Sequence, residues 1–314
     1  MRKLIILVAL LLLTVLLGVT NQGCSSTTAF VANSTPGAAK APMAAFIEGP
    51  VAFSTNGSIM GTATNDGSGL TMLSGRLRDF HSVYVLPDGS KAVFAAHATD
   101  GYSQIYYLAP VDNTAEPVQL TSTPLHKTNV MLSGDGRKLT FLQFNPVQAS
   151  DYPKWDVAVM NADGSNLHVI QAPGAASFSH PSFSPDATKI VVAMGVAAWG
   201  EEWDIYTMNA DGTNLIRLTP DGLPGETPAF SSDGKQIVFC STAQGDASIY
   251  IMNNDGSGLN RVGPQDSQWR DPLFVSERIM FVDQKEVNSI KPDGTGLKQV
   301  THNTIDDSFE RSID

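Results

Sequence analysis

The chain has 314 residues, of which 31 are acidic and 20 are basic, so its formal net charge is −11. This acidic balance argues against nucleic-acid binding, which requires clustered Lys and Arg to neutralise phosphates. Apolar residues make up 42% of the sequence, which excludes a disordered chain. The 27 glycines and 18 prolines, spread between short β-branched and aromatic runs, indicate many strands joined by turns.

The chain begins with a pattern typical of an export signal. Two basic residues precede an apolar run over 4–19, which is shorter than the roughly 20 residues of a bilayer-spanning helix. The following segment Asn21–Cys24 resembles the lipobox of bacterial lipoproteins, in which the cysteine becomes the lipidated N-terminus. We therefore predict a lipoprotein-type signal peptide over 1–23 and lipidation at Cys24. The alternative is a plain secretory signal.

A low-charge segment separates this signal from the rest of the chain. Residues 24–42 are rich in Ser, Thr, Ala, Gly and Pro and cannot bury enough apolar area to offset their ordering entropy. We interpret them as a flexible tether for a globular domain over 43–314. The expected location is outside the cytoplasm, in the periplasm or on the cell surface, held to a membrane by the lipid on Cys24.

The globular part is built from one repeated unit. A string similar to Met-Asn-Ala-Asp-Gly-Ser-Asn-Leu occurs at 160–167 and 208–215, and variants follow and precede it about every 45 residues. Its aspartates mark six units and are Asp66, Asp112, Asp163, Asp211, Asp255 and Asp293.

Each unit also carries a second turn signal between two apolar runs, as in Phe230-Ser231-Ser232-Asp233-Gly234. Asp-Gly at such a place is a strong hairpin signal, because Gly accepts a positive φ without steric cost. Two hairpins predict four strands in each unit. In one unit we expect them at 228–231, 236–240, 248–253 and 259–262.

An isolated four-stranded sheet cannot bury both of its faces. Packing such sheets radially around an axis buries them and leaves only short edges, which predicts an all-β, six-bladed β-propeller of four-stranded antiparallel blades. The N-terminal segment 51–73 aligns with the last three strands of a unit, and 306–314 aligns with the start of a first strand. We predict that these two segments form one blade together and close the ring.

The repeats resemble those of TolB-type six-bladed propellers, a WD-like family with a Ser-Pro-Asp-Gly repeat. The residues that carry the resemblance in one unit are Leu218-Thr219, Pro228–Gly234, Ile237–Phe239 and Ile249–Asn253. The resemblance covers 49–314. It implies the propeller fold but leaves function open, since similar blades occur in envelope scaffold proteins, in prolyl-oligopeptidase-like peptidases and in sugar-related enzymes.

Signatures of catalysis are missing from the sequence. It contains no Gly-x-Ser-x-Gly nucleophile elbow, no His-Glu-x-x-His and no P-loop. The Asn-x-Asp-Gly-Ser strings superficially resemble calcium loops but lack the later bidentate acid, so turn chemistry is the better interpretation. We expect no catalytic residue, no cofactor and no metal ligand.

Blade topology separates the loops into two faces. The Asp-Gly turns share one face, and the longer loops share the other. Two long loops of neighbouring units, 144–155 and 195–203, bring aromatic and acidic residues to that second face. These candidate binding residues are Tyr152, Trp155, Trp199, Glu201, Glu202 and Trp203. Exposed aromatics beside carboxylates suit a peptide or carbohydrate. Alternatively, Trp155 and Trp203 pack between blades.

The first strand of each unit begins with polar residues near the predicted axis on the same face. These pairs are His81-Ser82, Thr128-Asn129, Ser179-His180, Glu226-Thr227, Arg270-Asp271 and Asp307-Ser308. We single out His81, His126, His180, Arg270 and Asp271 as candidate binding residues of a central funnel. The alternative is a hydrated channel without a specific ligand.

The sequence favours a non-enzymatic envelope lipoprotein, a monomer whose propeller binds an envelope protein or peptide and no nucleic acid. Two alternatives remain at this point: a carbohydrate- or small-ligand-binding protein that uses the funnel, and a metal-assisted lyase or hydrolase.

Overall fold

The structure is a computed structural model of the chain. It describes residues 51–55, 59–63, 71–73, 78–85, 91–109, 116–146, 154–174, 176–196, 203–243, 247–263, 269–275, 277–283 and 286–299. Within these residues the secondary structure is entirely β, and every strand pairing is antiparallel. No helix among them has the length and apolarity that crossing a membrane requires.

The described strands form one three-stranded sheet and five four-stranded sheets, and neighbours in each sheet follow chain order. The three-stranded sheet comprises β1 (Val51–Thr55), β2 (Ile59–Ala63) and β3 (Thr71–Leu73). The first and second four-stranded sheets comprise β4 (Arg78–Val85), β5 (Ala92–His97), β6 (Ser103–Leu108) and β7 (Val118–Gln119), then β8 (Lys127–Leu132), β9 (Lys138–Asn145), β10 (Lys154–Asn161) and β11 (His168–Ile170).

The remaining three sheets repeat this order. They comprise β12 (Ala176–Phe183), β13 (Lys189–Val196), β14 (Trp203–Asn209) and β15 (Ile216–Arg217), then β16 (Glu226–Phe230), β17 (Gln236–Ser241), β18 (Ser248–Asn253) and β19 (Asn260–Val262), and finally β20 (Trp269–Val275), β21 (Arg278–Asp283), β22 (Glu286–Ile290) and β23 (Lys298–Gln299).

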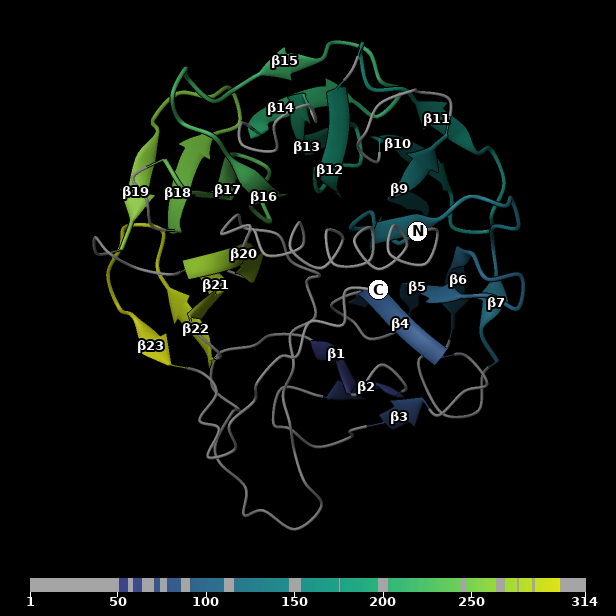
Figure 1. The fold of residues 1–314 in the computed structure, drawn as a ribbon. Coiled ribbons are helices and arrows are strands. Elements are labelled where there is room, and N and C mark those ends of the chain that lie inside the picture. Colours follow the sequence, from purple (N-terminus) through teal and green to yellow (C-terminus); the bar gives the residue numbers. More distant parts are fainter. Residues whose placement is uncertain are drawn as a thin grey trace, which may run out of the picture.

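The sheets are arranged about a common centre, as the blades of a propeller are (Figure 1). The first strand of each four-stranded sheet lies nearest the centre, and the short last strands β7, β15, β19 and β23 lie at the periphery. Successive first strands contact one another, from β4 through β8, β12 and β16 to β20. We call these five the inner strands.

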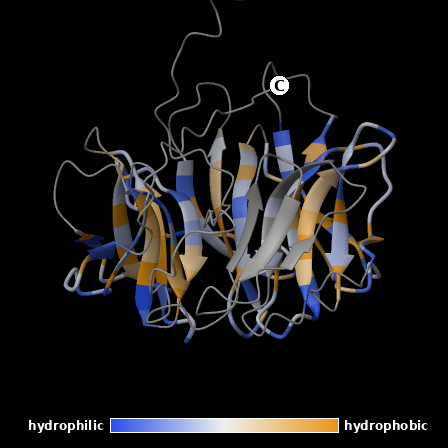
Figure 2. Ribbon diagram, turned by 90° about the horizontal axis from the view of Figure 1, so that it is seen from below, coloured by the Kyte–Doolittle hydropathy of each residue, from blue (hydrophilic) through white to orange (hydrophobic). Residues whose placement is uncertain are grey.

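The hydrophobic core lies between the sheets. Four clusters of buried residues each draw from two successive four-stranded sheets, and Phe141, Phe239 and Phe281 are fully buried in three of them. The apolar residues accordingly run along the strands, whereas hydrophilic residues gather at the turns (Figure 2). Burial of each large side chain stabilises the fold by about 1.5–3 kcal/mol, so sheet-against-sheet packing holds the assembly together.

The turns between the first and second strands share one hydrogen-bond pattern. The Oδ1 atom of Asp135 accepts the Ser133 hydroxyl at 2.6 Å and the Arg137 N–H at 3.0 Å. Asp186 and Asp233 do the same in the next two sheets. The serine hydroxyl also accepts the N–H of the residue that starts the second strand. Each turn therefore satisfies its own polar groups.

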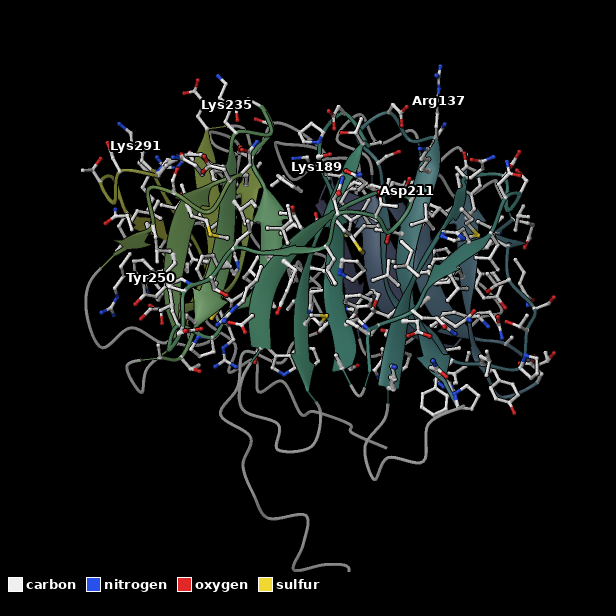
Figure 3. The ribbon with its side chains drawn as sticks, turned by 90° about the horizontal axis from the view of Figure 1, so that it is seen from above. Arg137, Lys189, Asp211, Lys235, Tyr250 and Lys291 are labelled. Carbon is white, nitrogen blue, oxygen red and sulfur yellow. The ribbon has the colours of Figure 1, made fainter. Side chains whose placement is uncertain are left out.

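A related pattern closes the turns between the third and fourth strands. The Oδ1 atom of Asp163 accepts both the N–H and the hydroxyl of Ser165, at 2.9 and 2.6 Å. Asp211, Asp255 and Asp293 repeat it with a Thr or Ser two residues later. Turn chemistry thus accounts for these residues. Figure 3 shows Arg137, Lys235 and Lys291, which flank both kinds of turn, along one edge of the molecule, here called the turn edge.

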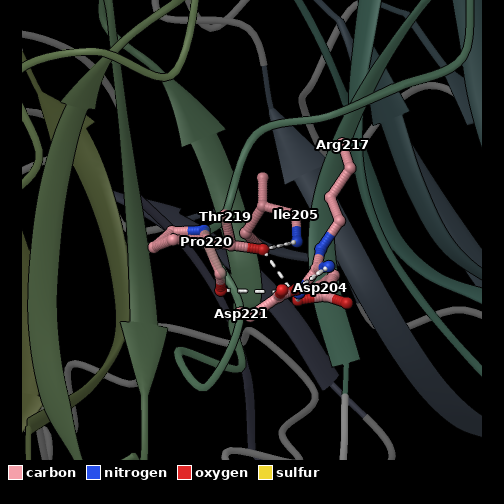
Figure 4. A network of polar contacts seen from close by, with 6 residues as sticks. All are labelled: Asp204, Ile205, Arg217, Thr219, Pro220 and Asp221. Atoms are coloured by element: carbon pink, nitrogen blue, oxygen red, sulfur yellow. Dashed lines mark hydrogen bonds and ion pairs between the residues drawn. The ribbon is translucent and has the colours of Figure 1, made fainter.

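The Leu-Thr motif fixes the peripheral strands. Thr219 Oγ1 accepts the N–H of Ile205 at 3.1 Å and donates to Asp204 at 2.8 Å (Figure 4). Arg217 adds contacts at 2.8 Å to Asp204 and at 2.6 Å to Asp221. In the first four-stranded sheet, Thr121 makes the corresponding bonds with Ile105 and Gln104. The motif therefore ties a two-residue strand to the longer strand beside it.

The strands expected at 228–231, 236–240, 248–253 and 259–262 correspond to β16–β19, and the third has the expected bounds. The largest difference is at β16, which starts at Glu226 rather than Pro228 and shifts register in its pairing with β17. The signal peptide, the tether, Cys24 and the closing segment 306–314 lie outside the described residues.

Candidate functional site

One left-handed residue interrupts each of the five inner strands. They are Ser82 (φ 55°), Asn129 (φ 51°), His180 (φ 48°), Thr227 (φ 51°) and Asp271 (φ 56°). In every case the pairing with the second strand shifts register across this residue. We call these five residues the inner ring.

The inner ring carries backbone strain that glycine would relieve. Asn and Asp tolerate the left-handed region, whereas a β-branched residue such as Thr227 is an outlier there. Such strain costs on the order of 1–3 kcal/mol per residue and is concentrated at functional sites in proteins. A bulge also re-aims the side chain and removes a residue from the ladder. The ring is thus a polar feature that the sheet alone does not require.

At the junction of β4 and β8, the ring residues bridge neighbouring strands. Ser82 Oγ lies 3.1 Å from Thr128 Oγ1 and accepts the N–H of Asn129 at 2.8 Å. Thr128 Oγ1 also lies 3.1 Å from Asn129 Oδ1. The ring residue of β4, Ser82, therefore contacts both Thr128 and Asn129 of β8.

The ring residue of β12 is a histidine. His180 Nδ1 lies 2.6 Å from the hydroxyl of Ser179, the residue before it, and both side chains are partly exposed. His180 is the fifth of the eight residues of β12, so this candidate residue lies within an inner strand rather than at its start.

The junction of β16 and β20 differs, because it contains a buried hydroxyl without a hydrogen-bond partner. Thr227 is 6% exposed, and its Oγ1 atom has no hydrogen-bond partner. Burial, and secondarily the charge of Asp271, raises the pKa of Glu226 to about 7. A carboxyl with such a raised pKa is typical of a functional site. Arg270 lies beside them on β20, partly exposed.

A second cluster lies where the first sheet meets the loop before β8. The His126 ring centroid lies 5.2 Å from that of Tyr102 and 6.2 Å from that of His97. His126 Nδ1 accepts the N–H of Ser103 at 3.3 Å. Burial, then the charges of His97 and Lys127, lowers the pKa of His126, so its neutral form is favoured. The sequence singled out His126 but gave no signal for its partners.

Two of the three tryptophans of the predicted aromatic patch lie at the start of third strands. Trp155 is the second residue of β10 and packs against the cluster between the second and third four-stranded sheets, with Phe144 at 5.7 Å. Trp203 opens β14 and packs against the next cluster. Both are partly buried and belong to different clusters. The structure therefore gives each ring a packing role, in a separate cluster.

Several candidate residues cannot be placed. Tyr152, Trp199, Glu201 and Glu202 lie outside the described residues, and of His81 only the backbone, within β4, is described. The described residues contain no group of three or more His, Cys, Asp or Glu that could hold a metal ion.

Antiparallel four-stranded sheets about a common centre define a β-propeller. The TolB beta propeller domain family matches residues 131–312, more than half of the chain. The chain therefore belongs to this family. No curated protein matches its sequence.

Solved structures of low sequence identity share the fold. A candidate TolB from Agrobacterium tumefaciens is 19% identical, covers 74% of this chain and 84% of its own, and has a TM-score of 0.58. TolB from Acinetobacter baumannii is 18% identical over 75% of this chain, with a TM-score of 0.57. This chain spans 57% of that protein's length.

An enzyme has the same fold. An oligogalacturonate lyase from Vibrio parahaemolyticus is 13% identical, covers 81% of this chain and 75% of its own, and has a TM-score of 0.59. At such identities the likeness concerns the propeller alone, so function has to be argued from the site.

Proposed function

We propose that the protein is a non-enzymatic scaffold of the cell envelope that binds a protein or peptide segment at the inner ring. The observation that carries the proposal is the repetition of one strained, polar, left-handed residue on five successive inner strands. A purely structural strand start would favour Gly or Asn at this backbone position. Thr227 and His180 stand there instead, and they offer side chains for recognition.

The turn edge is a poor alternative surface. Seven of its aspartates, Asp135, Asp163, Asp186, Asp211, Asp233, Asp255 and Asp293, accept hydrogen bonds within their own turns. Groups already paired have less to gain from a partner than unpaired ones. The inner ring offers more, because the hydroxyl of Thr227 has no hydrogen-bond partner.

The proposal includes export and anchoring. The basic and apolar residues of 1–23 would direct the chain across a membrane, and a lipid on Cys24 would hold it there. Residues 24–42 would then keep the domain over 43–314 away from the bilayer. The partner is accordingly expected in the envelope.

The proposal also includes a closed ring of six blades. The three-stranded sheet β1–β3 has the strand order of the other sheets without their first strand. Residues 306–314 would supply that strand and would set Asp307-Ser308 at the ring position between Arg270-Asp271 and His81-Ser82. Joining both ends of the chain in one sheet would make the domain a single cooperative unit.

Two other functions use the same site. A carbohydrate or small ligand in the funnel would exploit the polar ring, and a metal-assisted lyase or hydrolase would need metal ligands there. The fold likeness to an oligogalacturonate lyase does not favour the enzyme, because it concerns the fold alone. Binding of glycans that is lost in His180→Ala, or chelator-sensitive activity on polysaccharide or peptide, would support these alternatives.

Partner capture with matched variants tests the proposal. The lipidated full-length protein is cross-linked in its own envelope, and the captured protein is purified and titrated against wild type. We expect His180→Ala and Thr227→Asn to weaken binding at least about tenfold, which corresponds to the loss of one or two good hydrogen bonds. Lys235→Ala on the turn edge is the control and should bind normally. Equal affinity of ring and control variants would contradict the proposal.

A further inference from the structure

We propose that Glu226, Thr227 and Asp271 form a subsite for a basic side chain, the ammonium of Lys or the guanidinium of Arg, on the bound partner. This inference rests on the proposed function and names the chemistry that the inner ring recognises. It places the subsite at the junction of β16 and β20.

The two carboxyl groups belong to neighbouring inner strands. Glu226 opens β16 and Asp271 lies in β20, and the two inner strands contact each other. Asp271 is 8% exposed, and its charge acts on Glu226. Nearby like charges in a partly desolvated site repel each other, so a cation bound between them is favoured over the empty state.

Glu226 lacks an internal cation to balance it. Within the described part of the chain, ion pairs join Arg137 to Asp135, Arg217 to Asp204 and Asp221, and Lys235 to Asp233. None of them involves Glu226. Burial raises its pKa with no hydrogen bond to oppose the effect. A carboxylate that lacks a partner at such a site can gain one from a ligand.

Thr227 supplies an independent indication of a ligand. It is 6% exposed, yet its hydroxyl has no hydrogen-bond partner. At the same ring position, Ser82 directs its hydroxyl to the next inner strand and meets two polar groups there. Thr227 has a similar φ at the same ring position, 51° against 55° for Ser82. Its hydroxyl nevertheless lacks the bonds that the Ser82 hydroxyl makes, so it is left open as an acceptor for a ligand.

The formal charges of the named residues suit a monovalent group. Glu226 and Asp271 are acidic and Arg270 is basic, so the three sum to −1 when both carboxyl groups are ionised. A single positive charge on a ligand balances that sum. An ammonium or guanidinium group also has several N–H donors, which match the two carboxylates and the Thr227 hydroxyl. The formal charge of −11 adds a long-range attraction for a basic partner.

Selection of peptides tests the subsite. A random peptide library is panned against the wild-type full-length protein, and each selected peptide is titrated against wild type and the double variant Glu226→Gln/Asp271→Asn. Glu277→Gln is the charge control, because Glu277 is an exposed carboxylate on the turn edge. Thermal melting confirms that all variants are folded.

We expect the selected peptides to share a Lys or Arg at one position. Its replacement by norleucine should weaken binding to wild type and to Glu277→Gln about tenfold or more, and to the double variant less than about twofold. Peptides without a shared basic residue, or an equal norleucine effect in all three proteins, would overturn the subsite while leaving peptide binding intact.

A second measurement covers the case in which no peptide is selected, which would count against the proposed function. N-acetyl-lysine methylamide and its norleucine analogue are titrated while the side-chain carboxyl signals of Glu226 and Asp271 are followed by NMR. A shift with the lysine derivative alone supports the subsite. No shift with either compound overturns it.

Discussion

The turn edge and the inner ring are built from the same residue types but satisfy them differently. At the turn edge Ser184 donates to Asp186 at 2.6 Å and accepts the N–H of Lys189 at 3.0 Å, so each polar group has a partner. At the inner ring Thr227 is strained and its hydroxyl is unpartnered. The turn edge therefore stabilises the fold. The ring lowers the stability of the fold, and contacts with a bound partner can offset that loss.

The largest effect is expected at Glu226, whose pKa is about 7 in the folded protein and near 4.5 when the chain is unfolded. A raised carboxyl pKa stabilises the fold fully below pH 4.5, and this contribution is lost as the pH rises through 7. Glu226→Gln should therefore be about 2–3 kcal/mol more stable than wild type at pH 8 and equal to it at pH 4. Urea unfolding at both pH values measures this difference. Equal stability at pH 8 would show that Glu226 is well solvated or paired.

The next effect concerns a turn-edge serine. Ser184→Ala removes the hydroxyl that accepts the Lys189 N–H and donates to Asp186, so we expect a loss of about 1–3 kcal/mol. Thr227→Ala removes no hydrogen bond, and the cost of truncating it should stay well below that of Ser184→Ala. Paired urea denaturation curves give the comparison. A larger loss at Thr227 would reverse the roles that we assign to the two regions.

A smaller effect is expected from turn conformation. Ala187 occupies a left-handed position (φ 55°) at which the equivalent turns have Gly136 and Gly234. Ala187→Gly should therefore stabilise the protein by about 1 kcal/mol, and Gly234→Ala should destabilise it by a similar amount. Melting temperatures of both variants check this. Changes of the same sign in the two variants would contradict the turn equivalence.

The smallest effect per residue is expected on lowering the pH. The hydroxyl and N–H bonds within each turn lower the pKa values of aspartates such as Asp163 and Asp233 below their usual range. Their contribution to stability is complete above about pH 4 and is lost as the pH falls through the lowered values. The hydrogen-exchange protection factors of the N–H groups that donate to these aspartates should therefore fall below pH 4. Unchanged protection factors there would show that the bonds do not depend on charge.

The turns and strands could be predicted from sequence because each depends on local chemistry. Asp-Gly between apolar runs fixes the hairpins, and the period of about 45 residues fixes the number of strands in each sheet. The Leu-Thr pattern was visible in Leu218-Thr219. Its role became clear only from the structure, in which the Thr219 hydroxyl accepts the N–H of Ile205.

The ring geometry could not be predicted in this way. The sequence placed Glu226-Thr227 and Arg270-Asp271 near the axis, but it gave no sign of the register shifts there, and the left-handed conformation opposes the preference of the β-branched Thr227. Trp155 and Trp203 showed the converse difficulty. The sequence does not distinguish an aromatic residue at a strand start that faces solvent from one that packs between sheets. These two tryptophans pack against clusters between sheets.

The most direct test of the whole account is the footprint of the captured partner by amide hydrogen exchange. We expect protection on binding along the starts of the inner strands, including 226–229 and 270–273, and unchanged exchange at the turns 231–236 and 253–257. Protection confined to those turns, with exchange at the inner strands unaltered, would contradict the assignment of binding to the inner ring.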